Sequence, residues 1–396
     1  MSLDSATMPF PARLRTRLQP DPAILGLALA ILLGGLVVLA SASISISDNV
    51  SGDPFFYVRR QALAAVVGVL AAWCCVLVPM SVWQSLGPLL LLAGVALLAA
   101  VFVPGLGYEV NGATRWLRAG VMNVQVSEPA RLCLILYLAG YLVRRNRTLR
   151  EQFTGFLRPM LLLTLACALL LAEPDFGAAI VLLATALTML FVAGARLRDF
   201  FLFFGAGVIA MTALAITSPY RLQRLTSFLR PWDDPFNSGF QLTQSLIAIG
   251  RGEWLGVGLG NSVQKLFYLP EAHTDFVFAV FAEELGLLGA TALVAVFAAL
   301  VWRIFRLAIR AARADRMFEA YLAVGIGTWI GLQVFINVGV NMGLLPTKGL
   351  TLPLVSYGRS SLIVFMIALG LLLRIHHELV TDSKPANRRS RRGEEA

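Results

Sequence analysis

One long polar segment holds the side chains best suited to chemistry. Residues 218–275 mix acids, bases and aromatic rings over nearly sixty positions, and the segment ends in Glu271, His273 and Asp275 just before an apolar run. Connecting segments of this length are usually functional. Apolar surroundings raise the pKa of a carboxyl group, which makes Asp275 a candidate general base. The mixture of charged and aromatic residues suits a ligand with a charged head and an apolar tail.

Two shorter polar segments, residues 104–131 and 341–361, carry further candidates. Arginine, lysine and hydroxyl side chains bind phosphate groups, and aromatic rings stack on sugars. The candidate contacts to the ligand from all segments are Arg115, Trp116, Ser127, Glu128, Asp175, Gln241, Lys265, His273, Lys348, Ser356, Tyr357, Ser360 and Ser361. The glycine-rich run 250–260 is no phosphate loop, because it lacks the Gly-Lys-Ser/Thr ending. Tight turns and close packing account for its glycines.

The elements that position these residues are membrane helices. Hydrophobic residues make up 58% of the 396 residues and charged residues 14%, whereas an ordinary soluble chain has about 25% charged residues. We therefore predict an all-α polytopic membrane protein. Its ten spans are apolar runs without Asp, Glu, Lys or Arg, which argues against an ion-coupled transporter. The predicted spans are 24–40, 62–78, 86–103, 132–143 (with its start expected a turn earlier), 160–172, 177–194, 200–217, 285–301, 321–340 and 362–373.

The distribution of charge predicts the topology. With both termini cytoplasmic, 21 of the 33 Lys and Arg residues lie on the inner side, which carries about +11 against about −1 outside, as the positive-inside rule requires. We predict a cytoplasmic tail at 1–20, a ten-helix domain at 21–380 with 218–275 as a periplasmic loop between the seventh and eighth spans, and a basic cytoplasmic tail at 381–396. The net charge of +10 indicates topology or anionic lipid rather than nucleic acid.

Four sequence segments resemble the signature of the SEDS family (shape, elongation, division and sporulation). The segments are Asn111-Gly-Ala-Thr-Arg-Trp116, Glu173-Pro-Asp-Phe-Gly177, Tyr268-Leu-Pro-Glu-Ala-His-Thr-Asp-Phe276 with Glu283-Glu-Leu-Gly286, and Pro353-Leu-Val-Ser-Tyr-Gly-Arg-Ser-Ser361. They occur in the family's order from about residue 20 to 380. Residues 345–353 are similar to the cell-division branch of the family rather than the elongation branch.

The resemblance implies a peptidoglycan glycosyltransferase of the bacterial inner membrane that polymerises lipid II at the division septum. The 4-hydroxyl of one lipid-linked disaccharide would attack the anomeric carbon of another with inversion, and undecaprenyl pyrophosphate would leave. Inversion requires one base, for which the resemblance indicates Asp275. It also implies a class B penicillin-binding protein as partner, together with other membrane proteins of the division machinery, and a periplasmic active site. A divalent cation, Mg²⁺ or Mn²⁺, is a possible cofactor.

Several alternatives stay open at this point. Thr274 or Asp275 could simply cap the eighth span, and Trp116 could belong to the interfacial aromatic belt. Asp175 could hold a cation, cap a helix or pair with an arginine. Arg359, where the family usually has glycine, could contact phosphate or pair with Glu128 or Glu173. For the whole protein, a lipid II flippase and a non-catalytic division scaffold are the alternatives, and the charge-free spans count against the flippase.

Overall fold

The computed structural model describes residues 18–110, 113–119, 122–217, 227–237, 239–347 and 349–383. Ten of its helices have 17 residues or more and correspond one for one to the predicted spans. The ten are α2 (Pro22–Ser51), α3 (Phe56–Leu77), α4 (Met80–Ala100), α5 (Ser127–Arg144), α7 (Phe153–Ala172), α8 (Phe176–Val192), α9 (Leu197–Ile216), α12 (Val277–Arg313), α13 (Met317–Asn341) and α14 (Arg359–Ser383). Two shorter helices are α6 (Asn146–Glu151) and α11 (Phe240–Arg251).

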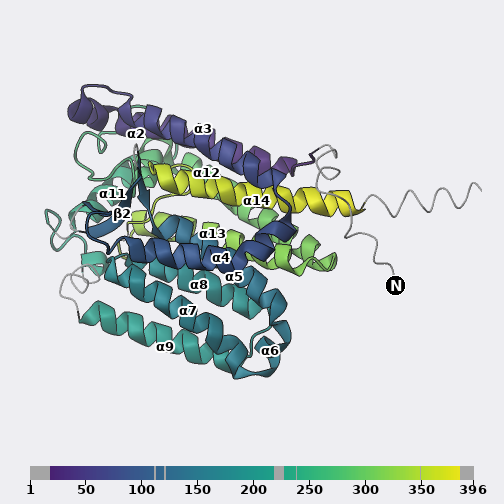
Figure 1. The fold of residues 1–396 in the computed structure, drawn as a ribbon. Coiled ribbons are helices and arrows are strands. Elements are labelled where there is room, and N and C mark those ends of the chain that lie inside the picture. Colours follow the sequence, from purple (N-terminus) through teal and green to yellow (C-terminus); the bar gives the residue numbers. More distant parts are fainter. Residues whose placement is uncertain are drawn as a thin grey trace, which may run out of the picture.

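Seven of the ten long helices are long and apolar enough to cross a membrane: α2, α3, α4, α7, α12, α13 and α14. The helices lie side by side as one bundle (Figure 1). The predicted polytopic membrane fold is therefore confirmed. Most of the two predicted tails lies outside the described residues, since the description begins at residue 18 and ends at 383.

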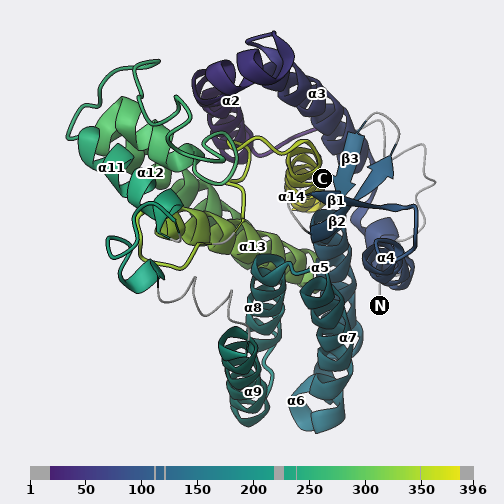
Figure 2. The same ribbon diagram turned by 90° about the vertical axis from the view of Figure 1, so that its left-hand side faces the viewer.

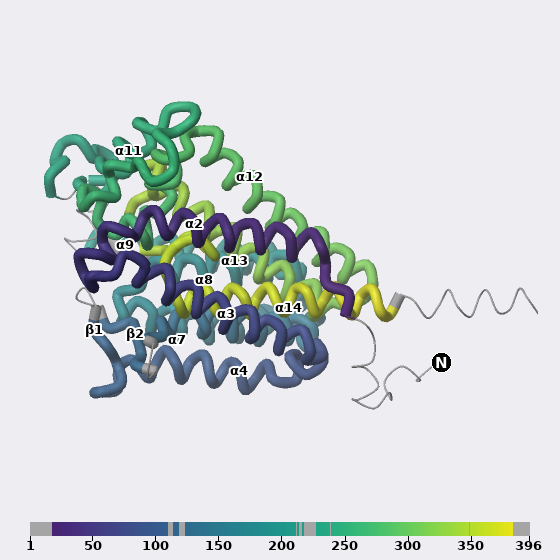
Figure 3. The backbone as a smooth tube through the Cα atoms, turned by 90° about the horizontal axis from the view of Figure 1, so that it is seen from above, coloured from purple at the N-terminus to yellow at the C-terminus, as the bar shows by residue number. Residues whose placement is uncertain are grey.

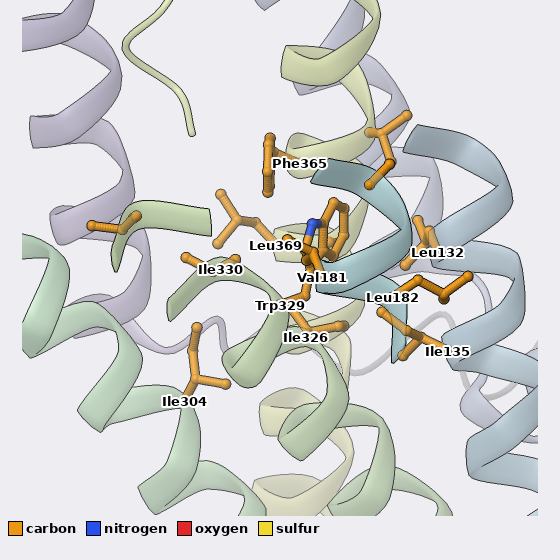
Figure 4. Close-up of a cluster of buried hydrophobic side chains, with 14 of the residues drawn as sticks. Leu132, Ile135, Val181, Leu182, Ile304, Ile326, Trp329, Ile330, Phe365 and Leu369 are labelled. Carbon is orange, nitrogen blue, oxygen red and sulfur yellow. The ribbon is translucent and has the colours of Figure 1, made fainter. Parts of the chain in front are cut away.

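Helix α13 forms the centre of the bundle. Trp329 on α13 is fully buried, and its ring stacks on Phe365 of α14 with centroids 4.6 Å apart. Figure 4 shows residues of α5, α8 and α12 closing around the same part of α13, among them Ile135, Val181 and Ile304. In Figure 2, α13 runs between the group formed by α2, α3 and α12 and the group formed by α7, α8 and α9. A central helix that is mostly buried can carry polar side chains on its buried faces only where each finds a partner.

The start of α2 and the end of α14 lie at the same end of the bundle. Asp21 caps α2 by accepting hydrogen bonds from the Ala23 and Ile24 N–H groups. Its carboxylate also pairs with Arg303 of α12 at 3.0 Å and lies 3.2 Å from His376 of α14. Figure 3 shows both ends on the side away from α11 and the strands. The described chain therefore begins and ends on one side, as an even number of spans requires.

Three short strands interrupt the otherwise helical fold. They are β1 (Gly107–Val110), β2 (Ala113–Ala119) and β3 (Met122–Gln125), which form an antiparallel sheet in the order β1-β2-β3. Trp116 pairs with both Tyr108 and Gln125 across the sheet. The all-α prediction left out this sheet, which lies at the end of the bundle opposite the described termini (Figure 1). Its strands are too short to give a clear alternating pattern.

Helix α12 begins eight residues before the predicted span and bends at Gly286. The glycine has φ 65° and ψ −168°, a conformation that side chains disfavour. The bend leaves the Glu283 and Glu284 carbonyl groups without helical partners, and they accept hydrogen bonds from the N–H groups of Val257 and Gly258 at 3.0 Å. The glycine-rich run is thus a packing element against the bend. The predicted structural origin of its glycines is confirmed.

Charged residues also enter the helices, contrary to the prediction of charge-free spans. Helix α5 starts at Ser127, so that Glu128 and Arg131 belong to its first turns, and both are buried. Their charges are 3.3 Å apart. The apolar run itself begins only at residue 132 because it excludes ionisable residues, and the start expected a turn earlier agrees with the helix. The argument against a flippase from uncharged spans is weakened accordingly.

Candidate functional site

The segment 349–361 lies at the end of the bundle opposite the described termini, which we call the polar end. Gln61 of α3 holds it from one side, because its Nε2 donates to the Ser356 carbonyl at 3.0 Å and its Oε1 accepts from the Gly358 N–H at 3.2 Å. The Ser356 hydroxyl accepts from the Leu352 N–H at 2.8 Å. Ser356 therefore stabilises the turn that its own segment makes, and the segment is held in one conformation.

Asp275 lies beside this segment in a turn that two asparagines of α13 hold. The side-chain amides of Asn337 and Asn341 both donate to the Asp275 carbonyl, at 2.9 and 3.0 Å. Asn337 also donates to the Leu350 carbonyl at 2.6 Å. One helix thus positions the Asp275 backbone and the neighbouring segment together.

The N-terminus of α12 is capped from α13. The N-cap residue is Phe276, which has no side-chain cap, and the Ala279 N–H donates to Asn341 Oδ1 at 3.1 Å. The alternative that Thr274 or Asp275 is the N-cap residue is therefore wrong. The half-buried Asp275 carboxylate extends toward residue 349, where a Cβ in place of glycine would lie 3.3 Å from Oδ2.

His273 packs in an aromatic cluster next to Asp275. Its ring centroid is 4.7 Å from that of Tyr57 and 5.8 Å from that of Tyr357, and the Tyr357 N–H donates to the His273 carbonyl at 2.9 Å. Burial lowers the pKa of His273 below its usual value, while the nearby Glu271 opposes this effect. The histidine is therefore neutral near pH 7, and its buried Nδ1 has no hydrogen-bond partner among the described residues.

A second acidic turn, Glu173–Asp175, joins α7 to α8. Asp175 is the N-cap of α8 and accepts from the Ala178 N–H at 3.0 Å, so the capping alternative for this residue is confirmed. Arg115 of β2 donates from Nε to the Glu173 carbonyl at 3.0 Å and from Nη2 to the Pro174 carbonyl at 2.8 Å. Two of its N–H groups thus fix the sheet to the turn, which leaves the rest of the guanidinium for a ligand.

Glu173, in the same turn, has a carboxyl group without compensating hydrogen bonds in the described part of the chain. It is 1% exposed, and neither carboxyl oxygen has a hydrogen-bond partner among the described residues. Burial raises the pKa of Glu173 to about 8, the neighbouring Asp175 adds to the rise, and Arg115 partly opposes it. The side chain is therefore protonated at neutral pH.

The two acidic turns are connected through β3 and α14. Gln125 Nε2 donates to Asp175 at 3.5 Å, and the Gln125 N–H donates to the Ser360 hydroxyl at 3.3 Å. The Ser361 and Thr351 hydroxyls are 3.4 Å apart. The structure thus brings Arg115, Asp175, Ser356, Tyr357, Ser360, Ser361, His273 and Asp275 to one end of the bundle, on segments that are far apart in sequence.

Ser127 and Glu128 lie deeper in the bundle, where they are buried. Glu128 pairs with Arg131, whose Nη1 also donates to Gln333 of α13 at 3.1 Å. Gln333 Nε2 in turn donates to the Thr351 carbonyl at 3.1 Å. This buried network contacts the segment 349–361 from the interior of the bundle, through the hydrogen bond to the Thr351 carbonyl. Glu128 is therefore a supporting residue in this conformation rather than part of an open surface.

Lys265 departs furthest from its predicted role. It is buried, and its ammonium pairs with Glu284 at 2.8 Å and donates to the Ser41 hydroxyl at 2.9 Å. The neighbouring Glu283 pairs with Arg251 at the end of α11, at 3.4 Å. A buried lysine needs a counter-charge, and Glu284 supplies it. Lys265 is therefore a structural residue and not an exposed phosphate contact.

The remaining candidates are less constrained. Trp116 is half-buried on β2, and Gln241 is half-buried in the first turn of α11. Lys348 lies outside the described residues. Arg359 is the first residue of α14. Of its two suggested acidic partners, Glu173 has no hydrogen-bond partner for its carboxyl group among the described residues.

A divalent cation would find few protein ligands here. Within the described residues, no group of three or more His, Cys, Asp or Glu side chains has metal-binding geometry. Mg²⁺ is commonly held by one or two carboxylates together with substrate phosphates and water. Asp175 can supply one such carboxylate, because each of its oxygens accepts a single hydrogen bond among the described residues, from the Ala178 N–H and from Gln125 Nε2. The donor set is therefore compatible with a cation bound jointly with a phosphorylated ligand.

The sequence interpretation missed several residues that hold the site together: Tyr57, Gln61, Arg131, Gln333, Asn337 and Asn341. Spacing offered a signal for some of them. Asn337 and Asn341 are four residues apart in an apolar helix, and Glu128 and Arg131 are three apart, so each pair lies on one helix face. Polar residues on one face of a membrane helix indicate a buried contact. The partners of Gln61, almost three hundred residues away, had no local signal.

Comparison with known proteins gives matches over nearly the whole chain. Residues 23–381 match a family of cell cycle proteins represented by FtsW, RodA and SpoVE. A probable peptidoglycan glycosyltransferase FtsW from Thioalkalivibrio sulfidiphilus is 59% identical over 359 residues, 90% of either chain. One from Nitrosococcus halophilus is 54% identical over 360 residues, 91% of this chain and 93% of its own.

Solved structures show the same fold. A chain from a peptidoglycan synthase complex that coordinates polymerization and crosslinking superposes with a TM-score of 0.75 and 32% identity, over 92% of this chain and 99% of the other. The rod shape determining protein RodA of Thermus thermophilus superposes with a TM-score of 0.68 and 31% identity, over 91% and 98% of the respective chains.

Proposed function

This chain belongs to the family of cell cycle proteins that includes FtsW, RodA and SpoVE, and we infer that it is a peptidoglycan glycosyltransferase. Its relatives with 59% and 54% identity carry that name over nine-tenths of the chain. The family expected from the four sequence segments is thus confirmed. On this basis we propose the substrate, the mechanism, the partner and the orientation of the protein.

The proposed substrate is lipid II, which serves as both donor and acceptor. The observation that carries the mechanism is the Asp275 turn. Its backbone is fixed by Asn337 and Asn341, and its carboxylate extends over Gly349 at the polar end of the bundle. A base has to be held within hydrogen-bond reach of the proton it removes. A turn held from two positions of a central helix provides such a support.

In the proposed reaction, Asp275 accepts the proton of the acceptor's 4-hydroxyl as its oxygen attacks the anomeric carbon of the donor. The glycosidic bond forms, the bond from the anomeric carbon to the diphosphate breaks, and undecaprenyl diphosphate leaves with the electron pair. Configuration at the anomeric carbon inverts. A positioned base contributes about 10²–10⁴-fold to such a rate.

The leaving diphosphate requires neutralisation of its charge. The free part of the Arg115 guanidinium and the Ser360 and Ser361 hydroxyls at the start of α14 are the proposed contacts, because helix N-termini bind anions. Mg²⁺ or Mn²⁺ held by Asp175 together with the phosphates would supply further positive charge when bound. Chelation of divalent cations is expected to lower the rate and added Mg²⁺ to restore it.

The proposed orientation places the β-sheet, α11 and the Asp275 turn in the periplasm and both termini in the cytoplasm. It rests on the excess of basic residues at the other end of the bundle. Single cysteines at the exposed positions Asn237 and Gln152, in a cysteine-free background, should react with impermeant reagents from opposite sides. Labelling of both from the same side contradicts this topology.

The proposed partner is a class B penicillin-binding protein, and the proposed place of action is the division septum. A structural relative belongs to a complex that coordinates polymerization and crosslinking. The decisive experiment is polymerisation of labelled lipid II by the purified chain, alone and with this partner. We expect glycan strands of many repeats, with a higher rate in the complex. Absence of polymer in both reactions, with lipid II bound, would refute the proposed activity.

A further inference from the structure

A basic cavity lies at the end of the bundle opposite the Asp275 turn. It is open to the surroundings of the bundle, is lined by residues of α4, α5 and α7, and has a volume of about 670 Å³. Three arginines line it: Arg144 and Arg145 at the end of α5, and Arg158 in α7. The opposite wall is apolar and includes Leu91 and Leu92 of α4. The cavity therefore has a cationic side and a hydrocarbon side.

The guanidinium groups of the three arginines have no carboxylate and no hydrogen-bond partner among the described residues. The nearby Arg147 differs, because its guanidinium pairs with Glu151 at 3.0 Å. All three cavity arginines are exposed, so their charges are hydrated rather than compensated by the protein. Like charges around one cavity repel each other. An anionic occupant would remove this repulsion, and Arg147 provides an internal control for a paired arginine.

A specific contact between α5 and α7 fixes the two helices that carry the arginines. Pro159 lies within α7 and has no N–H, so the Gly155 carbonyl four residues earlier loses its helical donor. The Tyr141 hydroxyl of α5 donates to that carbonyl at 2.8 Å. This bond joins α5 to α7 at the cavity. The positions of the helices that carry the arginines are thus set by the protein before any ligand binds.

We propose that this cavity binds an anionic phospholipid. The guanidinium groups would bind the phosphate of the headgroup in the bidentate manner typical of arginine, and the start of an acyl chain would lie along Leu91 and Leu92. Basic pockets between membrane helices on the cytoplasmic side bind anionic headgroups in this way. Leu92 is 67% exposed to the surroundings of the bundle, so a lipid can enter sideways. The bound lipid would hold α4, α5 and α7 together at the end remote from the candidate site.

The test uses the full chain, purified and delipidated in neutral detergent. Binding of phosphatidylglycerol and of phosphatidylethanolamine is measured by native mass spectrometry and by the shift in melting temperature, with inorganic phosphate alone as a third ligand. We expect phosphatidylglycerol to bind at least about tenfold tighter than phosphatidylethanolamine. Inorganic phosphate should give a much smaller shift, because it lacks the acyl chain.

Variants then assign the preference to the cavity. The triple change Arg144→Gln, Arg145→Gln and Arg158→Gln should lower the affinity for phosphatidylglycerol about tenfold or more. The matched control, Arg147→Gln, Arg196→Gln and Arg313→Gln, removes the same charge from the same end and should leave the affinity within about twofold, since none of these three residues lines the cavity and isolated surface charges contribute little.

Three results overturn the proposal. The first is equal binding of the two lipids by the wild-type chain, a measurement that does not depend on the folding of any variant. The second is an equal loss in the two triple variants, which would indicate unspecific charge attraction. The third is a shift with inorganic phosphate as large as with the lipid, which would identify a free anion as the ligand.

Discussion

Two turns at the polar end of the bundle have the same local pattern and different structural roles. Glu173–Asp175 precedes α8 and Glu271–Asp275 precedes α12, and both contain an aspartate just before an apolar helix. In the first turn Asp175 caps its own helix. In the second, Asn341 of α13 caps α12 and also binds the Asp275 carbonyl. The second helix does not depend on the aspartate as its N-cap residue.

This difference shows how a fold can assign helix capping to one residue and leave another carboxylate available for the proposed reaction. A carboxylate that caps a helix contributes to stability, and its removal costs the helix about 1 kcal/mol. Where a neighbouring helix supplies the cap, the aspartate is positioned through its backbone. Although the two turns share a sequence pattern, substitution of Asp175 is therefore expected to reduce stability, whereas substitution of Asp275 is expected to reduce activity. Variants of the two turns can test the distinction.

The largest effect is expected for Asp275→Asn. The amide cannot accept a proton, so polymerisation of lipid II should fall by about 10²–10⁴-fold. The backbone contacts from Asn337 and Asn341 remain, so the melting temperature should stay near that of the wild type. The control is Asp233→Asn in the exposed loop, which should leave both quantities unchanged. A fully active Asp275→Asn protein would exclude this residue as the base.

Asn341→Ala should damage stability and activity together. It removes the cap on the Ala279 N–H and one of the two donors to the Asp275 carbonyl. The expected loss in the free energy of unfolding is about 1–3 kcal/mol, the sum of these two hydrogen bonds. The measurements are the melting temperature and the rate of polymerisation. Asn237→Ala, in the exposed loop, is the control, and equal effects of the two changes would contradict the assigned role of Asn341.

Glu173 should make stability depend on pH. Its pKa is raised to about 8 by burial in the folded state, whereas the unfolded carboxyl group titrates near its usual value. The unfolded state binds fewer protons between these two values, so stability should fall as pH rises toward 8 and level off above it. The expected slope is at most about 1.4 kcal/mol per pH unit.

Glu173→Gln is neutral at every pH, so this dependence should be flatter in the variant. Melting temperatures between pH 6 and pH 9 provide the measurement. Glu151→Gln is a useful control, because Glu151 is exposed and pairs with Arg147 at the other end of the bundle. Identical pH profiles for the wild type and Glu173→Gln would show that Glu173 is not the group responsible.

The smallest effect is expected at Asp175, where two substitutions sharpen the comparison. Asp175→Ala removes the cap of α8 and should cost about 1 kcal/mol of stability. Asp175→Asn keeps a good capping group and should be nearly as stable as the wild type. Lower activity of the stable Asn variant, with a higher Mg²⁺ requirement, would support the proposed cation contact. Full activity without a change in Mg²⁺ dependence would leave Asp175 with the capping role alone.

Much of the fold could be predicted from the sequence because span formation is a local property. A run of apolar residues long enough to cross the bilayer forms a helix wherever it occurs, and all ten runs correspond to helices. Predictions failed where two segments had to meet. Lys265 lies in a segment whose composition suits ligand binding, but next to the bend of α12 at Gly286 it is buried beside Glu284. Glu128 and Arg131, which compensate each other in the first turns of α5, were likewise not predicted to meet inside a helix.

The sequence by itself determined the membrane class, the number of long helices and the family, and it indicated Asp275 as the candidate base, because each depends on residue types in order along the chain. Only the tertiary structure decided what supports that aspartate and which polar residues face inward. Asn341 caps a helix that begins 64 positions earlier, and Gln61 holds a turn almost three hundred positions later. A buried polar group requires a partner, but its identity depends on which helices pack together.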